Sequence, residues 1–439
     1  MIPILSLSAM RDADRIAVGE RGQDALVRAA GTAVAITAQQ ILGGYYGARI
    51  AAVVGPGLNG ADGRIAAARL VNRGARVDVI NWNEAPAMLA GYDLVLDAAF
   101  GTGVSCPYVA PKVATGTLVL AVDLPSGVDT DTGALLGEPM TANATIALGA
   151  LKPAHLTGPA ADIVGELYFD GLGIVQSFED GLIRDGDLSS FVRLSSQDHK
   201  WKHAVQALVG STLMPGAAEL VLRGALAGGA SMIRLVSRGD VASQVQLPPE
   251  VVHVTDATVD MRCKAVVAGP GLGAGAPDWL RGPLKDLACP VVLDADSLDR
   301  QLIDDLAPRD GSWVLTPHAG EFARLTGREV SPDRFSDVRE LARATGCVVL
   351  LKGPTTVIAS PEGHLRVVTS GTSSLATAGT GDVLAGFIGA TIARGFEPLE
   401  AAALGAHLHG RAGARLAPYA HASEVAMSLA RLVGSLARN

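Results

Sequence analysis

A glycine-rich segment in the second half of the chain carries residues well suited to phosphate chemistry. Gly379, Thr380, Gly381 and Asp382 are consecutive, and an apolar run that predicts a helix follows them. Backbone N–H groups at the start of a helix point toward one spot, where the helix dipole also favours negative charge. Asp382 on the first turn could take a proton from a hydroxyl group that is being phosphorylated. The alternative is a purely structural role, because aspartate is a favoured helix cap.

Further polar residues and glycines follow apolar runs in the same half of the chain. They are Gly271 and Gly273, Asp294 and Asp296, His318 and Glu321, and Lys352. A lysine just past a strand is suited to phosphate contact. So many such residues beside one glycine turn favour phosphoryl transfer over an isolated helix cap. His318 taken alone could still be a capping or core histidine, since an imidazole near a strand end often has only a structural partner.

In the first half of the chain, four polar residues lie at or just after the ends of apolar runs. They are Asn59, Asp97, Asp123 and Ser126. In an open α/β sheet the carboxyl ends of the strands face the ligand crevice, so these side chains can converge. They offer only oxygen ligands, which suits a hard cation and excludes a soft-metal site. The alternative is that each of them caps the helix that follows.

Three glycines in this half formally match the dinucleotide-binding pattern: Gly55, Gly57 and Gly60. An ordinary NAD site would also have an acid at the end of the next strand, whereas Asp78 comes before the end of its run. Asp62 would in addition place a carboxylate where a pyrophosphate would bind. These two mismatches argue against a hydride-transferring dehydrogenase.

Short apolar runs that could position these residues recur along the chain, and each is followed by an Ala- and Leu-rich stretch. The runs are Ile50–Val54, Arg76–Ile80, Leu94–Leu96, Leu118–Val122, Ala265–Ala268, Val291–Leu293, Trp313–Leu315 and Val348–Leu351. Such runs are typical of strands covered on both faces of a parallel sheet, and their alternation with helices predicts an α/β fold. The most polar stretch, residues 180–196, places a domain boundary near residue 190. We therefore expect one domain at 1–190 and a second at 191–439.

The composition excludes several classes of protein. The chain has 439 residues, of which 49% are hydrophobic and 52 are glycine, so it can bury substantial cores. Its net charge of −8 does not resemble the basic footprint of a nucleic-acid binder. The N-terminus has no basic segment before an apolar one, and the longest uncharged run, 29–48, is interrupted by polar residues and glycines. We therefore expect no signal peptide and no membrane span.

The four cysteines are Cys106, Cys263, Cys289 and Cys347. They are far apart and form no CxxC pair, which argues against a disulfide scaffold and against a structural zinc site. We expect reduced, mostly buried thiols in a cytoplasmic protein.

Five motifs in residues 1 to about 175 together resemble the NAD(P)H-hydrate epimerase domain. They are ALVRAAG near residue 25, GPGLNGADG, DAAFGTG, VDLPSG and ALKP, in that order. The resemblance implies that the hydrated nicotinamide nucleotide is bound by Leu58, Asn59, Gly60, Ala61 and Asp62, and by Gly101, Thr102 and Gly103. It also implies that potassium is bound by Asn59, Asp97 and Ser126, and that Asp123 contacts the substrate and transfers the proton. The family loop is usually Asn-Asn-Gly-Gly-Asp, so Leu58 and Ala61 depart from it, and the segment from Val104 to Pro107 lacks the expected basic residue.

Residues 199 to about 415 resemble the ADP-dependent NAD(P)H-hydrate dehydratase, which has a ribokinase-like fold. The shared motifs are HKW, PGAAELVLRGAL, GPGLG, LDADSL, TPHAGEFARLTG, KGPTT and AGTGDVLAG. The resemblance implies that Ala217, Gly271 and His318 contact the hydrated nucleotide, and that Asp382 lies between the two ligands as the catalytic base. It also implies that the adenine nucleotide is lined by Lys352, Gly353, Pro354, Thr355, Thr356, Gly379, Thr380 and Gly381.

The two resemblances together imply one repair pathway on a Rossmann-like three-layer domain followed by a ribokinase-like α/β domain. The first domain would interconvert the C6 epimers of NAD(P)H hydrate. The second would dehydrate the S form to NAD(P)H, with ADP as the phosphoryl donor and with magnesium and potassium as cofactors. We expect small-molecule ligands, no nucleic acid or membrane partner, and a homo-oligomer. Two alternatives stay open: a ribokinase-type small-molecule kinase with a nucleotide-sensing first domain, and a non-catalytic nucleotide sensor.

Overall fold

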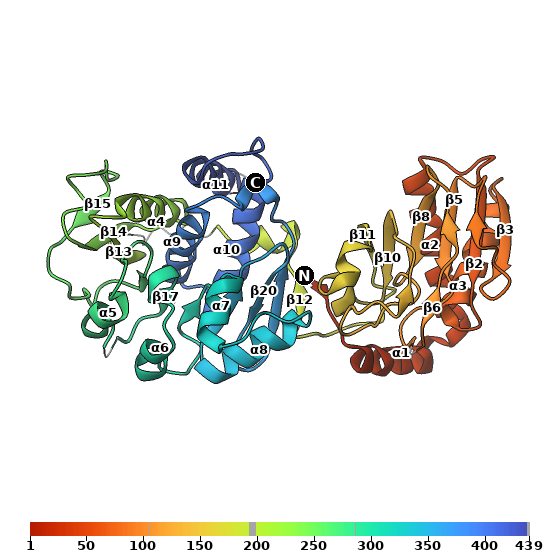
Figure 1. Cartoon of the computed structure of the whole chain (residues 1–439), viewed down its shortest axis with the longest axis horizontal. Helices are drawn as coiled ribbons and strands as arrows, with labels where there is room; N and C mark the ends of the chain where they lie inside the picture. Colours follow the sequence, from red (N-terminus) through yellow and green to blue (C-terminus); the bar gives the residue numbers. More distant parts are fainter. Residues whose placement is uncertain (105, 193–198, 286, 437–439) are drawn as a thin grey trace. The chain divides into compact units, whose positions relative to one another are not determined.

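The computed structural model describes the chain outside residues 105, 193–198, 286 and 437–439 (Figure 1). The chain divides into two compact units, Ile2–Asp180 and Gly181–Asn439, the latter together with Met1. This division falls before the boundary predicted near residue 190, because β12 (Gly181–Leu182) pairs with β21 (Leu365–Val368) in the second unit. Part of the predicted polar boundary segment, 193–196, lies outside the described residues, as does Ser105.

The first unit contains a parallel six-stranded sheet with the strand order β11-β10-β8-β5-β2-β3 (Figure 1). Its strands are β2 (Arg49–Val54), β3 (Arg76–Asn81), β5 (Leu94–Ala98), β8 (Leu118–Val122), β10 (Ala144–Leu148) and β11 (Glu166–Asp170). The sequence predicted the first four of these strands with nearly the same bounds. It missed β10, a short run with alanine and threonine, and β11, which is only partly buried.

Helices α2 (Gln23–Leu42) and α3 (Leu58–Val71) cover one face of this sheet and share a core with four of its strands. Connecting segments cover the other face, on which Leu89, Tyr108 and Met140 pack. Among the described residues, α2 is the one helix that is long and apolar enough to cross a membrane by length and composition. Its buried side chains pack on α3 and the sheet, as those of a core helix do.

The second unit contains a mixed sheet with the order β12-β21-β20-β19-β18-β17-β16-β13-β14-β15. Its other strands are β13 (Ala204–Ser211), β14 (Met232–Arg238), β15 (Val251–His253), β16 (Ala265–Ala268), β17 (Val291–Leu293), β18 (Val314–Leu315), β19 (Val348–Leu351) and β20 (Thr356–Ala359). The strands from β19 to β15 are parallel to their neighbours, whereas β20 is antiparallel to β19 and β21. The bounds of β16, β17 and β19 are those predicted. The sequence missed β13, although all of its residues are buried.

Four helices of the second unit pack together around the core on one face of the sheet. They are α4 (Pro215–Ala227), α9 (Thr380–Ala393), α10 (Pro398–Gly413) and α11 (Ala422–Leu436). Helices α4 and α9 approach at two glycines: a Cβ atom on Gly224 would lie 2.1 Å from the Val383 carbonyl oxygen, and one on Gly386 would lie 2.0 Å from that of Val221. This close packing fixes α9, whose first turn carries the predicted phosphate site.

Four shorter helices belong to the segments between β16 and β19 (Figure 1). They are α5 (Ala276–Leu284), α6 (Arg300–Leu306), α7 (Ala319–Thr326) and α8 (Arg334–Thr345). Helix α8 packs on β19 and β20, and α5 packs on α6.

The four cysteines are all free thiols. Cys263 and Cys347 are buried and Cys289 is half-buried, whereas Cys106 is exposed. The predicted burial therefore holds fully for two of them.

Candidate active sites

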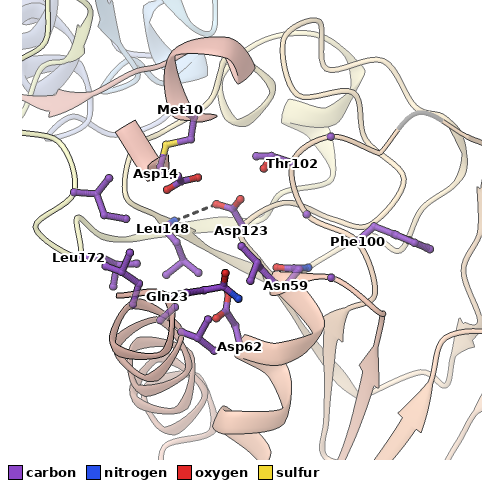
Figure 2. A pocket seen from close by; sticks show the side chains of 18 of the residues that line it. Met10, Asp14, Gln23, Asn59, Asp62, Phe100, Thr102, Asp123, Leu148 and Leu172 are labelled. Carbon is purple, nitrogen blue, oxygen red and sulfur yellow. Dashed lines mark hydrogen bonds between the residues drawn. The ribbon is translucent and has the colours of Figure 1, made fainter. Parts of the chain in front are cut away.

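The first unit has a cavity of about 400 Å³ at the carboxyl ends of its strands (Figure 2). Helix α1 (Leu7–Arg21), the starts of α2 and α3, and the loops after β5 and β8 supply its lining. The predicted residues that line it are Leu58, Asn59, Asp62, Gly101, Thr102, Gly103 and Asp123. Gly60 and Ala61 do not line it. The sequence missed two charged residues of the cavity, Asp14 and Lys152, of which Lys152 stands in the ALKP segment.

The predicted binding loop at residues 58–62 is in fact the first part of helix α3, which Gly57 caps. The loop itself is confined to residues 55–57, because the backbone is packed tightly there. A Cβ atom on Gly60 would lie 2.0 Å from the Gly55 carbonyl oxygen, and one on Gly55 would lie 1.8 Å from that of Ala99. Ala61 does not line the cavity, whereas Leu58 lines it and is half exposed.

Asp97 and Ser126 form a fully buried pair beneath the loop after β5. The Asp97 carboxylate accepts hydrogen bonds from the Ser126 backbone N–H (2.8 Å) and hydroxyl (2.5 Å). Burial raises the pKa of Asp97, although these hydrogen bonds oppose the shift. The Asn59 amide packs against the same loop, where a Cβ atom on Gly101 would lie 3.2 Å from Asn59 Oδ1.

These three residues offer only oxygen ligands, an amide oxygen, a carboxylate and a hydroxyl, and such ligands suit a hard cation. In the described part of the chain, no lysine or arginine pairs with Asp97, and burying an unpaired carboxylate is costly. Within the described ranges, no cluster of three or more His, Cys, Asp or Glu residues could hold a metal.

Asp123 follows β8 with a left-handed backbone, at φ +66°. Its carboxylate is ion-paired with the ammonium group of Lys152, which is 1% exposed and also donates to the Leu148 carbonyl oxygen at 2.8 Å. The Leu148 backbone N–H donates to Asp123 Oδ1 at 3.2 Å. The predicted substrate-contacting acid thus faces the cavity with a buried cation beside it (Figure 2).

Two further carboxyl groups face the same space as Asp123 in Figure 2, those of Asp14 and Asp62. Burial, with the nearby charges of Asp123 and Asp14, raises the pKa of Asp62 to about 8. Burial also raises the pKa of Asp14. One oxygen of Asp62 is buried with no hydrogen-bond partner. At neutral pH the cavity therefore offers a protonated carboxyl group opposite the Asp123–Lys152 ion pair.

In the second unit, helix α9 begins at Thr380, after the left-handed cap Gly379 at φ +88°. The sequence predicted the start at Asp382, so the helix begins slightly earlier and Asp382 lies within its first turn. A Cβ atom on Gly381 would lie 3.3 Å from Lys352 Nζ and 3.7 Å from Asp294 Oδ2. The structure thus brings the predicted glycine turn, the lysine after β19 and the acid after β17 to one point.

The charges at this point are closely coupled. Lys352 Nζ lies 2.8 Å from Asp294 Oδ1 and 3.7 Å from Glu321 Oε2. Burial would lower the pKa of Lys352, but these two carboxylates outweigh it, so the pKa is raised. Burial and the charge of Asp294 raise the pKa of Asp382 to about 7, and Lys352 opposes the shift. Asp382 can therefore gain and lose a proton near neutral pH.

His318 is the N-cap of α7, as the structural alternative predicted. Its Nδ1 accepts hydrogen bonds from the backbone N–H groups of Gly320 (3.0 Å) and Glu321 (3.2 Å). Its side chain is 58% exposed, and Nε2 lies 3.4 Å from Glu321 Oε1. Capping consequently uses one ring nitrogen, Nδ1, while Nε2 faces the Glu321 carboxylate.

The remaining predicted residues fall into two groups. Ala217 and Gly271 are neighbours, since a Cβ atom on Gly271 would lie 2.6 Å from Ala217 Cβ. Gly353, Pro354 and Thr355 form the exposed turn before β20, which begins at Thr356. The sequence missed Arg334, whose guanidinium donates at 3.4 Å to the carbonyl oxygens of Lys352 and Thr355 and so supports this turn.

Both halves of the chain match known families. Residues 205–434 match the family described as NAD(P)H-hydrate dehydratase, and residues 23–90 and 85–154 match the YjeF-related protein N-terminus. Curated relatives include the bifunctional NAD(P)H-hydrate repair enzyme Nnr of Mycobacterium leprae, 35% identical over 98% of both chains. The enzyme of the same name from Mycobacterium tuberculosis H37Rv is 37% identical over 82% of both chains.

Solved structures resemble the second half of the chain. The ADP/ATP-dependent NAD(P)H-hydrate dehydratase from Bacillus subtilis, co-crystallised with ATP and Mg²⁺, is 29% identical with a TM-score of 0.51. That match covers 56% of this chain and 94% of the other. A ribokinase-like superfamily protein from Enterococcus faecalis V583 is 21% identical, with a TM-score of 0.53 over 60% of this chain and 99% of the other, and it shows the fold alone.

Proposed function

The chain belongs to the family of bifunctional NAD(P)H-hydrate repair enzymes, and on that premise we propose that it restores NAD(P)H from its hydrate in two steps. The first unit interconverts the R and S epimers at C6, and the second dehydrates the S form with ADP, giving AMP and phosphate. The observation that carries the proposal is the meeting of Gly381, Lys352 and Asp382 at the start of α9. A helix start, a lysine and a titrating carboxylate at one point are suited to phosphoryl transfer.

Dehydration requires a better leaving group than hydroxide. Asp382 would take the proton of the C6 hydroxyl group while the oxygen of that hydroxyl attacks the terminal phosphorus of ADP, and AMP would leave. The N–H groups at the start of α9 and the Lys352 ammonium would stabilise the negative charge of the phosphoryl group. The C6–O bond then breaks with release of phosphate, and loss of a proton from C5 restores the ring double bond.

Magnesium would accompany the nucleotide, because Mg²⁺ in such sites binds substrate phosphates and one or two carboxylates. Asp294 fits this role, since its Oδ2 atom faces Gly381 while Oδ1 pairs with Lys352. A bound magnesium ion would neutralise charge on the transferred phosphate.

Epimerisation requires the C6–O bond to break and to form again on the other face of the ring. C6 is also bonded to the ring nitrogen, whose electron pair can stabilise C6 when the hydroxyl leaves as water. The protonated Asp62 can supply the proton with which the hydroxyl leaves as water. We assign Asp123, whose carboxylate Lys152 holds, to take up the proton when water adds to the other face of the ring, and return of that proton to Asp62 restores the site. Potassium would be bound by Asn59, Asp97 and Ser126 beneath the substrate loop, and it would supply positive charge there.

One assay tests both activities. The protein is incubated with an epimeric mixture of NADH hydrate, ADP and magnesium, and recovery of NADH absorbance is followed. Complete conversion supports both steps, whereas conversion of the S epimer alone shows that the first unit does not epimerise. No conversion, with ATP consumed on another hydroxyl substrate, would favour the small-molecule kinase. Asp382→Asn should lower turnover about 10²- to 10⁴-fold, the usual contribution of a general base. Asp278→Asn, which changes a carboxylate that is 91% exposed, is the matched control.

A further inference from the structure

We propose that His155 is a positioning residue for epimerisation, because its imidazole joins the backbones of Asp123 and Lys152 and so sets the Asp123–Lys152 ion pair at the cavity. The inference rests on the proposed epimerase function. His155 itself does not line the cavity, and it acts through the two residues that do.

The imidazole uses both of its nitrogens. Nε2 lies 2.6 Å from the Asp123 carbonyl oxygen, and Nδ1 accepts the Lys152 backbone N–H at 2.9 Å. A carbonyl oxygen can only accept, so Nε2 carries the hydrogen, and an N–H group can only donate, so Nδ1 carries none. The surroundings therefore select one neutral tautomer of a ring that is 3% exposed.

The neutral ring is also the stable form at this position. Burial and the positive charge of Lys152 lower the pKa of His155 to about 4, although Asp123 opposes the shift. A protonated ring would place a hydrogen on Nδ1 against the Lys152 N–H, with two donors facing each other. The bridge therefore stays intact across the neutral pH range.

Asp123 needs such support because its backbone is unusual. A residue other than glycine at φ +66° carries a conformational cost and persists where its surroundings hold it. The backbone N–H of Asp123 donates to the Ile146 carbonyl oxygen at 2.9 Å, and His155 holds the carbonyl on the other side. With both ends of the residue fixed, the carboxylate is directed at Lys152 and the cavity. Loss of the bridge should let the backbone relax and misplace the carboxylate.

Two substitutions separate the two hydrogen bonds in the full-length protein. His155→Gln can place its amide nitrogen near the Nε2 position and keep the donation to Asp123. His155→Asn can place its amide oxygen near the Nδ1 position and keep only the bond from Lys152. His155→Ala removes both. A matched control is Thr157→Val, since Thr157 is equally buried in the same segment and its hydroxyl donates to the Pro153 carbonyl oxygen, away from Asp123 and Lys152.

The readout is the conversion of purified R epimer to NADH, in which the unchanged second unit of each variant dehydrates the S epimer with ADP and magnesium in excess. We expect kcat to fall about 10- to 100-fold in His155→Ala and His155→Asn with KM little changed, because misplacing a catalytic group by about 1 Å can cost that much. His155→Gln should recover most of kcat, and Thr157→Val should keep it. Each variant should still dehydrate pure S epimer, which verifies the second unit.

Two results would overturn the proposal. One is a wild-type kcat in His155→Ala. The other is an equal loss of kcat in His155→Gln, His155→Asn and Thr157→Val, which would show a general packing defect. If His155→Ala does not fold, the comparison of the other two His155 variants decides: a kcat in His155→Asn equal to or above that of His155→Gln would refute the bridge. A wild-type protein that does not convert the R epimer would instead refute the proposed epimerase function.

Discussion

The protonation of Asp382 should control the pH dependence of dehydration. With a pKa of about 7, the carboxylate is about 91% ionised at pH 8 and about 9% ionised at pH 6, so kcat/KM should fall about tenfold between them. An aspartate at its ordinary value of 3.8 would be almost fully ionised at both pH values, and no such fall would occur. The sign follows from the role of a base, which is active only when it has lost its proton.

Two neighbouring charges should shift the pH at which kcat/KM falls, here called the acidic limb, in opposite directions. Asp294 raises the pKa of Asp382, so Asp294→Asn should shift the limb to lower pH. Lys352 lowers the same pKa, so Lys352→Met should shift the limb to higher pH. Both residues also belong to the proposed phosphoryl-transfer site, so their substitution should also lower the maximal kcat/KM. The apparent pKa of the acidic limb is therefore the informative quantity. Asp296 and Glu321, which also raise the pKa, remain in both variants.

The assay is kcat/KM for purified S epimer at saturating ADP and magnesium, measured between about pH 5.5 and pH 8.5. Asp382→Asn should lose a factor of about 10² to 10⁴, the usual contribution of a general base. Its residual rate should not vary between pH 6 and pH 8. A wild-type rate that is flat over this range, or an Asp382→Asn rate that keeps the limb, would refute the assignment of Asp382 as the base.

Three further predictions concern the first unit. Gly60→Ala should lower the melting temperature and reduce the free energy of unfolding by about 1–3 kcal/mol, because its Cβ atom would lie 2.0 Å from a backbone oxygen. The control Gly19→Ala should not lower the melting temperature, because its Cβ atom would meet nothing within 4 Å. Asp62→Asn should stabilise the protein at pH 8.5 by on the order of a few kcal/mol and not at pH 4, measured by urea unfolding. The unfolded chain loses the Asp62 proton near the ordinary pKa of 3.8 and the folded chain only near pH 8, so the wild type loses stability progressively between these two values. Replacing potassium in the buffer by a large organic cation should lower the epimerisation rate. In a potassium titration, the rate of Ser126→Ala should depend less on potassium than that of the wild type. A wild-type rate that is unchanged without potassium would argue against a cation beneath the substrate loop.

The sequence predicted the strand ends well because each is marked locally. Asp97 and Asp123 follow continuous apolar runs, and the parallel sheet places such residues at one edge. The glycine turn before α9 is also a local signal, since Gly379 needs a left-handed backbone there. What these residues share is that a few neighbouring side chains determine their place.

The missed features depend on contacts between distant segments. Asp14 lies on α1, and nothing in its own helix indicates that it faces the cavity beside Asp123. The sequence around His155 indicates only a turn residue, and its role depends on the Asp123 carbonyl oxygen, which the fold places 2.6 Å from Nε2. Residues 58–62, predicted as a binding loop, instead begin helix α3, and the close approach of Gly60 to the Gly55 carbonyl oxygen is likewise not visible in the local sequence.

The acid–base chemistry shows most clearly why the fold is needed. Asp382 lies in the first turn of α9, where the helix dipole lowers the pKa of an acid, and Asp62 lies just beyond the first turn of α3, where this effect is weaker. The local sequence therefore predicts ionised carboxylates with low pKa values. Burial and neighbouring carboxylates outweigh the dipole and raise the values to about 8 and about 7. The two residues can exchange protons near neutral pH because distant elements cover them, so their chemistry is a property of the folded chain and not of either motif.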